Sequence, residues 1–319
     1  MPRICVRGSS VATYDYMRFN EELLKNESVL VLPKDAFEKN DPLGVKRFSR
    51  FRIVYINENL DSTLTEEKCD LLYCIKYGKN DGIFSKKFPT AIHCVFDLSE
   101  PHGDIYAAVS ESLARKYNSK LFVPHMIALT PSQGDLREQF DIPKDAVVFG
   151  RYGGEDTFNI PFCFEAIFEL VQECSNIYFI FINTPHFIFG NRQVLFLPKI
   201  ITEEDKSKFI NTCDAHLECG TLGHSFGCAI GEFSVHNKPI IAYDPDKDKP
   251  LWNRAHLDIL GDKAIRFRTK EDFKNIIKTF NPIEAQKKDW NCYRQYSPEK
   301  VMDQFKKVFI DPIKIQSLD

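Results

Sequence analysis

The chain alternates twice between short apolar runs and helical patterns, and this alternation constrains its fold more than any other feature. In the first half, apolar runs typical of buried β-strands lie at residues 3–6, 29–32, 51–56, 71–75, 91–96 and 120–123. In the second half, similar runs lie at residues 147–149, 177–182, 194–197, 215–217, 239–242 and 264–267. Strands that alternate with helices at this spacing predict parallel sheets, and two rounds predict two doubly wound α/β domains.

A polar, turn-rich stretch at residues 130–145 separates the two rounds. A chain of 319 residues is also long enough for two domains of ordinary size. We therefore expect one domain at residues 1–130, a second at 131–296, and a C-terminal helix and tail at 297–319. The last helix has a clear start signal, because Ser297 and Pro298 precede an amphipathic run.

Composition narrows the class of protein further. The chain is 43% hydrophobic and 27% charged, which is typical of a globular protein with real cores. Its formal net charge of -3 gives no general attraction for nucleic acid or for anionic membranes. Ten cysteines without a C-x-x-C pattern favour free thiols in a reducing compartment, and no apolar run is long enough for a transmembrane helix. We expect a soluble, cytoplasmic protein.

Polar and small residues follow several of the predicted strands, at the edge where parallel sheets bind ligands. Gly8 and Ser9 follow the first run, where their N–H groups can face an anion. Arg151 follows the run at 147–149, and Gly153 and Gly154 come two and three residues after it. An arginine beside two glycines can pair with a diphosphate. The alternative from the residues alone is a salt bridge from Arg151 to an acidic residue of the same loop, Glu155 or Asp156.

Four glycines at spacings of three, four and four lie in the segment GTLGHSFGCAIGEFS, residues 220–234. Ser225 is a good N-cap, so we expect a helix from Phe226 whose free N–H groups attract an anion. Gly223 and Gly227 would then let the ligand approach the backbone, whereas Gly231 serves either the ligand or packing against the sheet. Glu232 has the chemistry to accept hydrogen bonds from sugar hydroxyls, although a lone glutamate in a helix is most often solvated.

Several other kinds of site are not indicated. The chain has no G-x-G-x-x-G and no G-x-x-x-x-G-K-[ST], so the dinucleotide and P-loop interpretations lose their main support. Its eight histidines show no H-E-x-x-H and no zinc spacing with cysteine, which predicts no metal site. A serine hydrolase is not indicated either. By default, His93 is a satisfied histidine inside a buried strand.

Four segments in this order resemble nucleotide-sugar glycosyltransferases of the GT-B fold, particularly the large retaining family with a glutamate pair seven residues apart. The segments are PTAIHCVFDLSEPHGDIYAAVSESL (89–113), FVPHMIAL (122–129), VFGRYGGEDTF (148–158) and HSFGCAIGEFSVHNKPIIAY (224–243). The resemblance covers most of the chain. It implies two Rossmann-like domains that face a central cleft, with the C-terminal helix packed back on the N-terminal domain.

The resemblance also implies a reaction. A sugar would move from a nucleoside-diphosphate sugar, UDP- or GDP-linked, to a glycan or other hydroxyl acceptor, with retention of configuration and without an essential metal or cofactor. Arg151 would bind the donor diphosphate and Glu232 the ribose. The phosphates would lie at Gly227 and the helix start, which includes Ser225 and Phe226.

In the N-terminal domain, the resemblance places His93 near the transferred sugar and Gly8 and Ser9 in a loop that faces donor and acceptor. Two positions depart from the family pattern. His224 stands where the family has its first glutamate, and Asp156 stands where it has a basic residue five after the arginine. A GT-B protein that binds a nucleotide sugar or glycan without turnover is therefore the main alternative. A sugar-nucleotide epimerase on the same fold is another, and an unrelated α/β oxidoreductase is a third.

Overall fold

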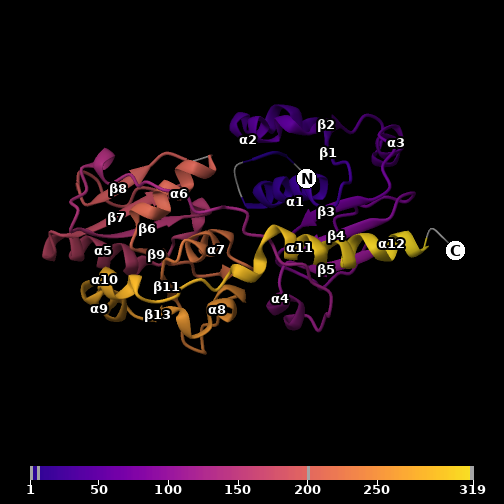
Figure 1. Ribbon diagram of the computed structural model, residues 1–319. Helices are drawn as coiled ribbons and strands as arrows, with labels where there is room; N and C mark the ends of the chain where they lie inside the picture. Colours follow the sequence, from indigo (N-terminus) through magenta and orange to yellow (C-terminus); the bar gives the residue numbers. More distant parts are fainter. Residues whose placement is uncertain (1–2, 6–7, 200–201, 317–319) are drawn as a thin grey trace. The chain divides into compact units, whose positions relative to one another are not determined.

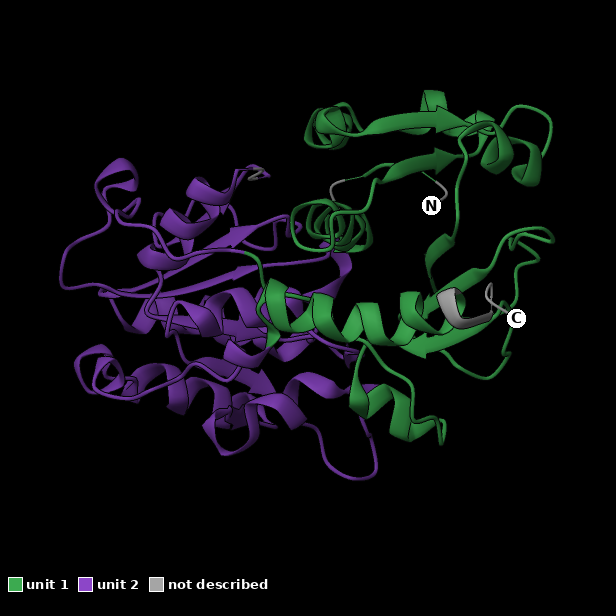
Figure 2. Cartoon of the chain, turned by 45° about the vertical axis from the view of Figure 1, so that its right-hand side comes forward, with its two compact units in different colours: residues 1–128, 296–319 green, residues 129–295 purple. Residues whose placement is uncertain are grey.

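The computed structural model describes residues 3–5, 8–199 and 202–316 (Figure 1). The chain divides into two compact units: unit 1 comprises residues 1–128 and 296–319, and unit 2 comprises residues 129–295 (Figure 2). Unit 2 is therefore continuous in sequence, whereas unit 1 is built from two separate stretches of chain. Both divisions lie next to the domain boundaries expected from the sequence.

Unit 2 is built on a six-stranded, wholly parallel sheet with the strand order β13-β11-β9-β6-β7-β8. Its strands are β6 (Val147–Tyr152), β7 (Ile177–Ile182), β8 (Val194–Leu197), β9 (Ala215–Glu218), β11 (Ile240–Tyr243) and β13 (Ile265–Phe267). Two further short strands, β10 (Gly223–His224) and β12 (Asn253–Arg254), pair with each other outside this sheet. All six predicted strands of the second half are present, because fully buried parallel strands are continuous apolar runs.

The helices of unit 2 alternate with these strands. They are α5 (Pro161–Glu173), α6 (Glu203–Thr212), α7 (Cys228–Val235), α8 (Ala255–Leu260), α9 (Lys270–Thr279) and α10 (Pro282–Gln286). The N-caps of α6 and α9 are the residues that their capping patterns predict, since Thr202 accepts from Asp205 N and Thr269 accepts from Asp272 N. In the main core of the unit, aromatic side chains of β6 and β7, such as Phe149 and Phe179, pack with residues of α5 and α9, such as Phe273 of α9.

Unit 1 contains two separate parallel sheets instead of the single doubly wound sheet expected from the sequence. One pairs β1 (Val29–Leu32) with β2 (Arg52–Tyr55), and the other orders β3 (Leu72–Lys76), β4 (Thr90–Cys94) and β5 (Ile105–Ala108). Its helices include α1 (Gly8–Glu22), α2 (Pro42–Arg47), α3 (Leu60–Glu66), α4 (Glu111–Lys116), α11 (Pro298–Phe305) and α12 (Asp311–Gln316), and a π-helical turn at Lys306–Ile310 joins the last two.

Two predicted strands of unit 1 differ in the structure. Residues 3–5 form no strand, and Val6 lies outside the described residues. The reason is local: Ile4 N donates to Asn40 Oδ1 at 2.7 Å and Cys5 N donates to Ser10 Oγ at 3.0 Å, so these backbone groups bond to side chains. The predicted strand at 120–123 is reduced to one bridge between Ala108 and Phe122.

The C-terminal helix completes a core of unit 1. Val301, Met302 and Phe305 of α11 pack with Tyr16 of α1 and Ala91 of β4. The Tyr16 and Phe305 rings stack with centroids 5.2 Å apart. The helix accordingly belongs to unit 1, together with the N-terminal residues.

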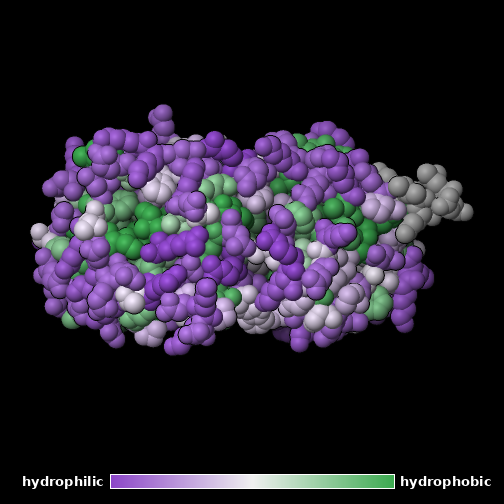
Figure 3. Space-filling model, turned by 90° about the horizontal axis from the view of Figure 1, so that it is seen from below, coloured by the Kyte–Doolittle hydropathy of each residue, from purple (hydrophilic) through white to green (hydrophobic). Residues whose placement is uncertain are grey.

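The surface is mostly hydrophilic on the face that Figure 3 shows, with apolar side chains gathered in several places. Among the described residues of unit 2, the most exposed large apolar side chains are Phe189, Ile283 and Leu222. Within the described residues, no helix is both long enough and apolar enough to span a bilayer.

Candidate functional site

The strand order of unit 2 fixes where a ligand crevice belongs. Strand β6 comes first in the unit, the chain then adds β7 and β8 on one side, and it returns to place β9 on the other side of β6. The order reverses between β6 and β9, and open parallel sheets bind ligands beyond the carboxyl ends of the strands at such a point. Arg151 and Glu218 lie at the carboxyl ends of these two strands. We refer to this switch point of the strand order as the β6–β9 crevice, a name for its place in the topology.

Arg151 is buried, with only 2% of its surface exposed, and its guanidinium organises the loop that follows β6. Nη1 donates to Thr184 Oγ1 at 2.6 Å, and Nη2 donates to the Gly154 carbonyl at 2.7 Å and to Thr157 Oγ1. Burial lowers the pKa of Arg151, and the nearby Glu218 carboxylate opposes this effect. Neither Glu155 nor Asp156 forms an ion pair with Arg151 in the described structure, so that alternative is wrong.

Gly153 is required by this arrangement. A Cβ added there would lie 2.9 Å from Arg151 Nη2, because the guanidinium packs against the loop backbone. From the end of β7, Asn183 Nδ2 donates to the Gly153 carbonyl at 2.8 Å. The ends of β6 and β7 and the loop of Gly153 and Gly154 are thus held together by hydrogen bonds.

Glu218 and His224 form an ion pair at the other side of the crevice. Glu218 Oε2 lies 2.9 Å from His224 Nε2, and Glu218 Oε1 accepts from Gly220 N at 3.1 Å. Burial alone would lower the pKa of His224, but the Glu218 carboxylate outweighs it and raises that pKa. Burial alone would raise the pKa of Glu218, and His224 holds it well below its usual range. The pair therefore favours its charged form.

Two more histidines surround this pair. His216 Nε2 lies 3.8 Å from Glu218 Oε2, and neither of its ring nitrogens has a hydrogen-bond partner in the described structure. Burial lowers the pKa of His216. His256 packs edge-on against His224 with ring centroids 5.3 Å apart, and burial lowers the pKa of His256 to about 3. His216 and His256 are therefore neutral at neutral pH.

The glycine-spaced segment is explained mainly by close packing. Gly223 has φ +65, and a Cβ there would lie 2.0 Å from the Asn253 carbonyl oxygen of β12. A Cβ on Gly220 would lie 2.8 Å from Glu218 Oε1, so this glycine makes room for the carboxylate. Gly231 is buried inside α7, and its N–H donates to the Gly227 carbonyl at 2.9 Å. These glycines let the segment pack tightly within unit 2.

The predicted start of the helix is wrong by two residues. Ser225 is not the N-cap: α7 begins at Cys228, and Gly227 caps it in the left-handed conformation with φ 88 and without a side-chain cap bond. Gly223 and His224 form β10 instead, so the turn falls at Ser225 and Phe226. Phe226 is buried, and its carbonyl accepts from Tyr293 OH at 2.8 Å. The free N–H groups at the start of the helix therefore belong to Cys228 and the residues after it, and not to Phe226 as the sequence predicts.

Glu232 is buried in α7 instead of solvated, with 8% of its surface exposed. Lys206 Nζ of α6 lies 2.5 Å from Glu232 Oε1, and Tyr152 OH donates to Oε2. Burial and the Glu232 charge raise the pKa of Tyr152 well above its usual value. Glu232 thus links the end of β6 to α6 and α7.

The remaining predicted residues belong to unit 1. His93 of β4 is fully buried: Nε2 donates to the Val123 carbonyl at 2.7 Å, and Nδ1 accepts from Tyr73 OH at 2.6 Å. Burial lowers the pKa of His93 to about 3. Gly8 and Ser9 lie in the first turn of α1 and not in a loop, so the expected loop is wrong there.

Residues 223–227 read G-x-S-x-G, the pattern of a serine nucleophile on a strained turn between strand and helix. The structure does not support that role. Ser225 is not among the described residues with positive φ, and its hydroxyl has no hydrogen bond to a histidine within the described ranges. Among the residues that the structure describes, no group of three His, Cys, Asp or Glu side chains could hold a metal ion.

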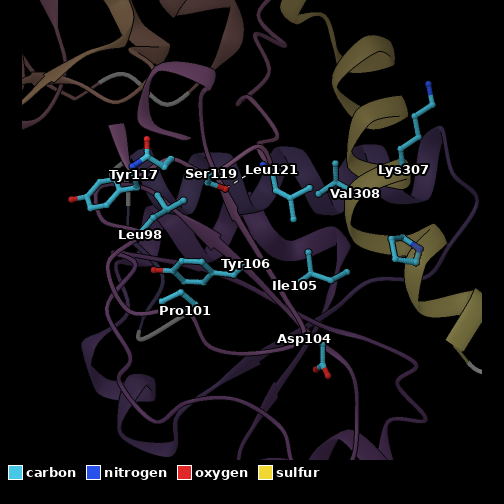
Figure 4. A pocket seen from close by; sticks show the side chains of 12 residues that line it. Leu98, Pro101, Asp104, Ile105, Tyr106, Tyr117, Ser119, Leu121, Lys307 and Val308 are labelled. Carbon is cyan, nitrogen blue, oxygen red and sulfur yellow. Dashed lines mark hydrogen bonds between the residues drawn. The ribbon is translucent and has the colours of Figure 1, made fainter. Parts of the chain in front are cut away.

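A hollow of about 490 Å³ lies in unit 1. Its walls come from β5, the segment 117–121 and the C-terminal segment 307–312, and Figure 4 shows Asp104 and Lys307 on opposite sides of a mostly apolar lining. All of its lining residues belong to unit 1, whereas the buried charged groups described above belong to unit 2. We therefore take the β6–β9 crevice as the candidate site.

Three residues of the crevice were missed from the sequence. Glu218 directly follows the apolar run at 215–217, so the rule that singled out Arg151 would also have found it. Lys206 and Thr184 reach the site only through folding, and no sequence signal marks them.

Comparison with known structures identifies the fold of the chain. No protein-family model matches the sequence, and no curated protein matches it. HepE of Anabaena, solved in complex with UDP-glucose, is similar over 99% of this chain and 96% of its own, with TM-score 0.65 and 14% identity. A glycosyltransferase of Rickettsia africae is similar over 100% of this chain and 95% of its own, with TM-score 0.66 and 10% identity.

MnaA of S. aureus, solved with UDP, covers 94% of each chain with TM-score 0.60 and 12% identity. These likenesses extend over nearly the whole chain. The chain therefore has the GT-B fold, and the fold predicted from the sequence is confirmed.

Proposed function

We propose that the chain is a glycosyltransferase that moves a sugar from a nucleoside-diphosphate sugar to an acceptor hydroxyl. The observation that carries the proposal is the β6–β9 crevice, a topological switch point with buried charged groups, in a chain that shares its fold with HepE in complex with UDP-glucose. MnaA, with the same fold, was solved with UDP. We therefore propose UDP as the nucleotide of the donor, with GDP as the alternative.

Unit 2 holds the nucleotide end of the donor in this proposal. Arg151 supplies a fixed positive charge behind the loop of Gly153 and Gly154, and the N-terminal amides of α7 face the phosphates. Glu232 accepts hydrogen bonds from the ribose. Its two oxygens offer about four lone-pair positions, and Lys206 and Tyr152 occupy two of them.

The chemistry is electrostatic. When the bond to the sugar breaks, the leaving diphosphate takes up negative charge, and preorganised positive groups stabilise it. We propose retention of configuration, no essential metal and no cofactor, with a glycan or another hydroxyl compound as acceptor and no role for nucleic acid. In unit 1, we keep Gly8 and Ser9 as predicted contacts to donor and acceptor, whereas His93 is not proposed as a sugar contact because it is fully buried and both of its ring nitrogens are hydrogen-bonded.

A GT-B protein that binds without turnover is the second candidate. It is favoured by His224 and Asp156, which replace an acidic and a basic residue of the family pattern. In addition, Arg151 and Glu232 both form hydrogen bonds within the protein, which leaves fewer of their polar atoms for a ligand.

Calorimetric titration with UDP and with GDP, followed by a hydrolysis assay with UDP-glucose, tests the proposal. Binding with slow release of glucose supports a transferase, and binding without release supports the second candidate. Arg151→Met should weaken UDP binding at least about tenfold because it removes a fixed positive charge from the crevice. Arg268→Met is the matched control, since Arg268 is an exposed arginine of unit 2 paired with Asp246. Equal affinity in all three proteins would reject the role of Arg151.

A further inference from the structure

The β6–β9 crevice needs a cation that can reach a ligand, and Arg151 is poorly placed for this. Its guanidinium is nearly inaccessible and already donates to Thr184, Gly154 and Thr157. His224 differs, because 26% of its side chain is exposed. Its Nε2 is buried 2.9 Å from Glu218 Oε2 as an ion-pair contact without hydrogen-bond geometry, and its Nδ1 forms no hydrogen bond within the described residues. Nδ1 is therefore available to a ligand.

Burial of Glu218 makes the charge of His224 necessary. Glu218 is 5% exposed, and apart from its contact with His224 it accepts, within the described part of the chain, a hydrogen bond only from Gly220 N. An isolated buried carboxylate is costly, so it needs a cation beside it. Arg151 acts on Glu218 only at longer range, since they form no ion pair in the described structure, and His216 lies 3.8 Å away as a neutral ring. Loss of the proton from His224 would leave Glu218 uncompensated.

The other charged and titratable groups around His224 come from the neighbouring elements. From β6, Arg151 opposes protonation of His224, and from α8, His256 stays neutral. From β12, Arg254 pairs in register with His224, but its guanidinium is engaged by Asp244 at 2.9 Å. Glu218 is thus the group that favours the imidazolium, and it is also the one in direct contact.

We propose that Glu218 holds His224 as an imidazolium, and that its Nδ1–H is a direct contact for the diphosphate of the donor. The second half rests on the proposed function. With His224 protonated, Arg151 and His224 together carry one more positive charge than Glu218 carries negative. The crevice then suits an anion, although Asp156 stands where the family pattern has a basic residue. Glu218 is a positioning residue here, because it acts through His224.

The first test needs no ligand. The Cε1–H signal of His224 is assigned by its loss in His224→Gln and followed by NMR against pH in the wild type and in Glu218→Gln. We expect the wild-type pKa of His224 to lie above about 6.5, and Glu218→Gln to lower it by about 1 to 3. The control Glu155→Gln removes an exposed carboxylate after β6 and should leave the titration unchanged. A wild-type pKa at or below the free value overturns the proposal, and this arm stands even if Glu218→Gln does not fold.

The second test measures UDP affinity by calorimetry between about pH 7 and pH 9, where the phosphates of UDP are already ionised. Wild-type affinity should fall about tenfold per pH unit above the pKa of His224, because one proton is linked to binding. His224→Lys should bind UDP with little change over this range, and His224→Gln should bind weakly throughout.

The outcomes separate the two claims. If neither UDP nor GDP binds at any pH, the proposed function fails, while the NMR titration still decides whether Glu218 holds His224 charged. If UDP binds equally well to the wild type and His224→Gln at every pH, the contact to the diphosphate is overturned and the proposed function stands.

Discussion

Lys206→Met is expected to destabilise unit 2 by about 3 kcal/mol. The substitution removes the ammonium that lies 2.5 Å from Glu232 Oε1 and keeps an apolar stem beside the Tyr152 ring. Loss of one partner of a buried ion pair costs about 3–5 kcal/mol, because the other charge stays buried and uncompensated. We take the lower end of this range, since the side chains are still 17% and 11% exposed.

The two other corners of the double-mutant cycle follow from the same contacts. Glu232→Gln should cost less, about 1–2 kcal/mol, because the amide oxygen still accepts from Tyr152 and the partly exposed Lys206 can reach water. The double variant has no buried charge left without a partner, so it should lie close to Glu232→Gln. The coupling between the two positions is then about 2–3 kcal/mol.

Urea unfolding followed by tryptophan fluorescence measures these free energies in the right part of the chain. Both tryptophans, Trp252 and Trp290, lie in unit 2, so their signal reports on that unit. The matched control is Lys208→Met on the same helix. Lys208 pairs with Glu204 at 2.6 Å, but Glu204 is 68% exposed, and such pairs contribute less than about 1 kcal/mol.

The reasoning is refuted if Lys206→Met costs no more than Lys208→Met, or if the double variant costs the sum of the single variants. Lys206→Met separates the two roles of Glu232, because it keeps the carboxylate but lowers the stability of unit 2. If Lys206→Met binds UDP nearly as well as the wild type and Glu232→Gln binds it weakly, the carboxylate contacts the nucleotide. If Lys206→Met loses more UDP affinity than Glu232→Gln, Glu232 acts through the stability of unit 2.

Three further predictions concern buried single residues. The pKa of His93 is lowered to about 3, so stability from its neutral form is lost as pH falls below about 6.5. As the pH falls from 6.5 to 5, the free energy of unfolding of the wild type should therefore fall by about 2 kcal/mol relative to that of His93→Gln, which does not titrate at this position. Hydrogen exchange of β4 measures this difference. Gly223→Ala puts a Cβ 2.0 Å from a β12 carbonyl and should cost more than about 2 kcal/mol by tryptophan fluorescence, whereas Gly190→Ala, with positive φ but open space, should cost about 1. Tyr293→Phe removes the bond to the Phe226 carbonyl and should cost about 1 kcal/mol in the same assay.

The parallel sheet of unit 2 could be predicted from the sequence because its central strands are buried on both faces. Residues 177–182 are all buried, and they form an unbroken apolar run. Unit 1 was less predictable, since its strands are short and two of the expected ones are replaced by loop contacts. Whether Ile4 pairs with a strand or with Asn40 depends on a residue far along the chain, which no local pattern reveals.

The candidate site was predictable in its place but not in its contacts. Arg151 and His224 were found from strand ends and from the family resemblance. The ion pair of Glu218 with His224 could not be predicted, because it depends on how the short strand β10 pairs with β12. For the same reason the sequence predicts Ser225 as the helix cap, whereas Gly227 in the left-handed conformation performs that role.

The division of unit 1 into two stretches of chain has a consequence for biosynthesis. Unit 2 is uninterrupted, so all of its strands are synthesised before α11. The N-terminal part of unit 1 therefore has an uncovered apolar face until Phe305 and Phe309 are synthesised and pack against Tyr16 and Tyr73. The part of unit 1 that is synthesised first is therefore completed last, and a released chain truncated before residue 298 would combine a complete unit 2 with an N-terminal part whose apolar face is uncovered.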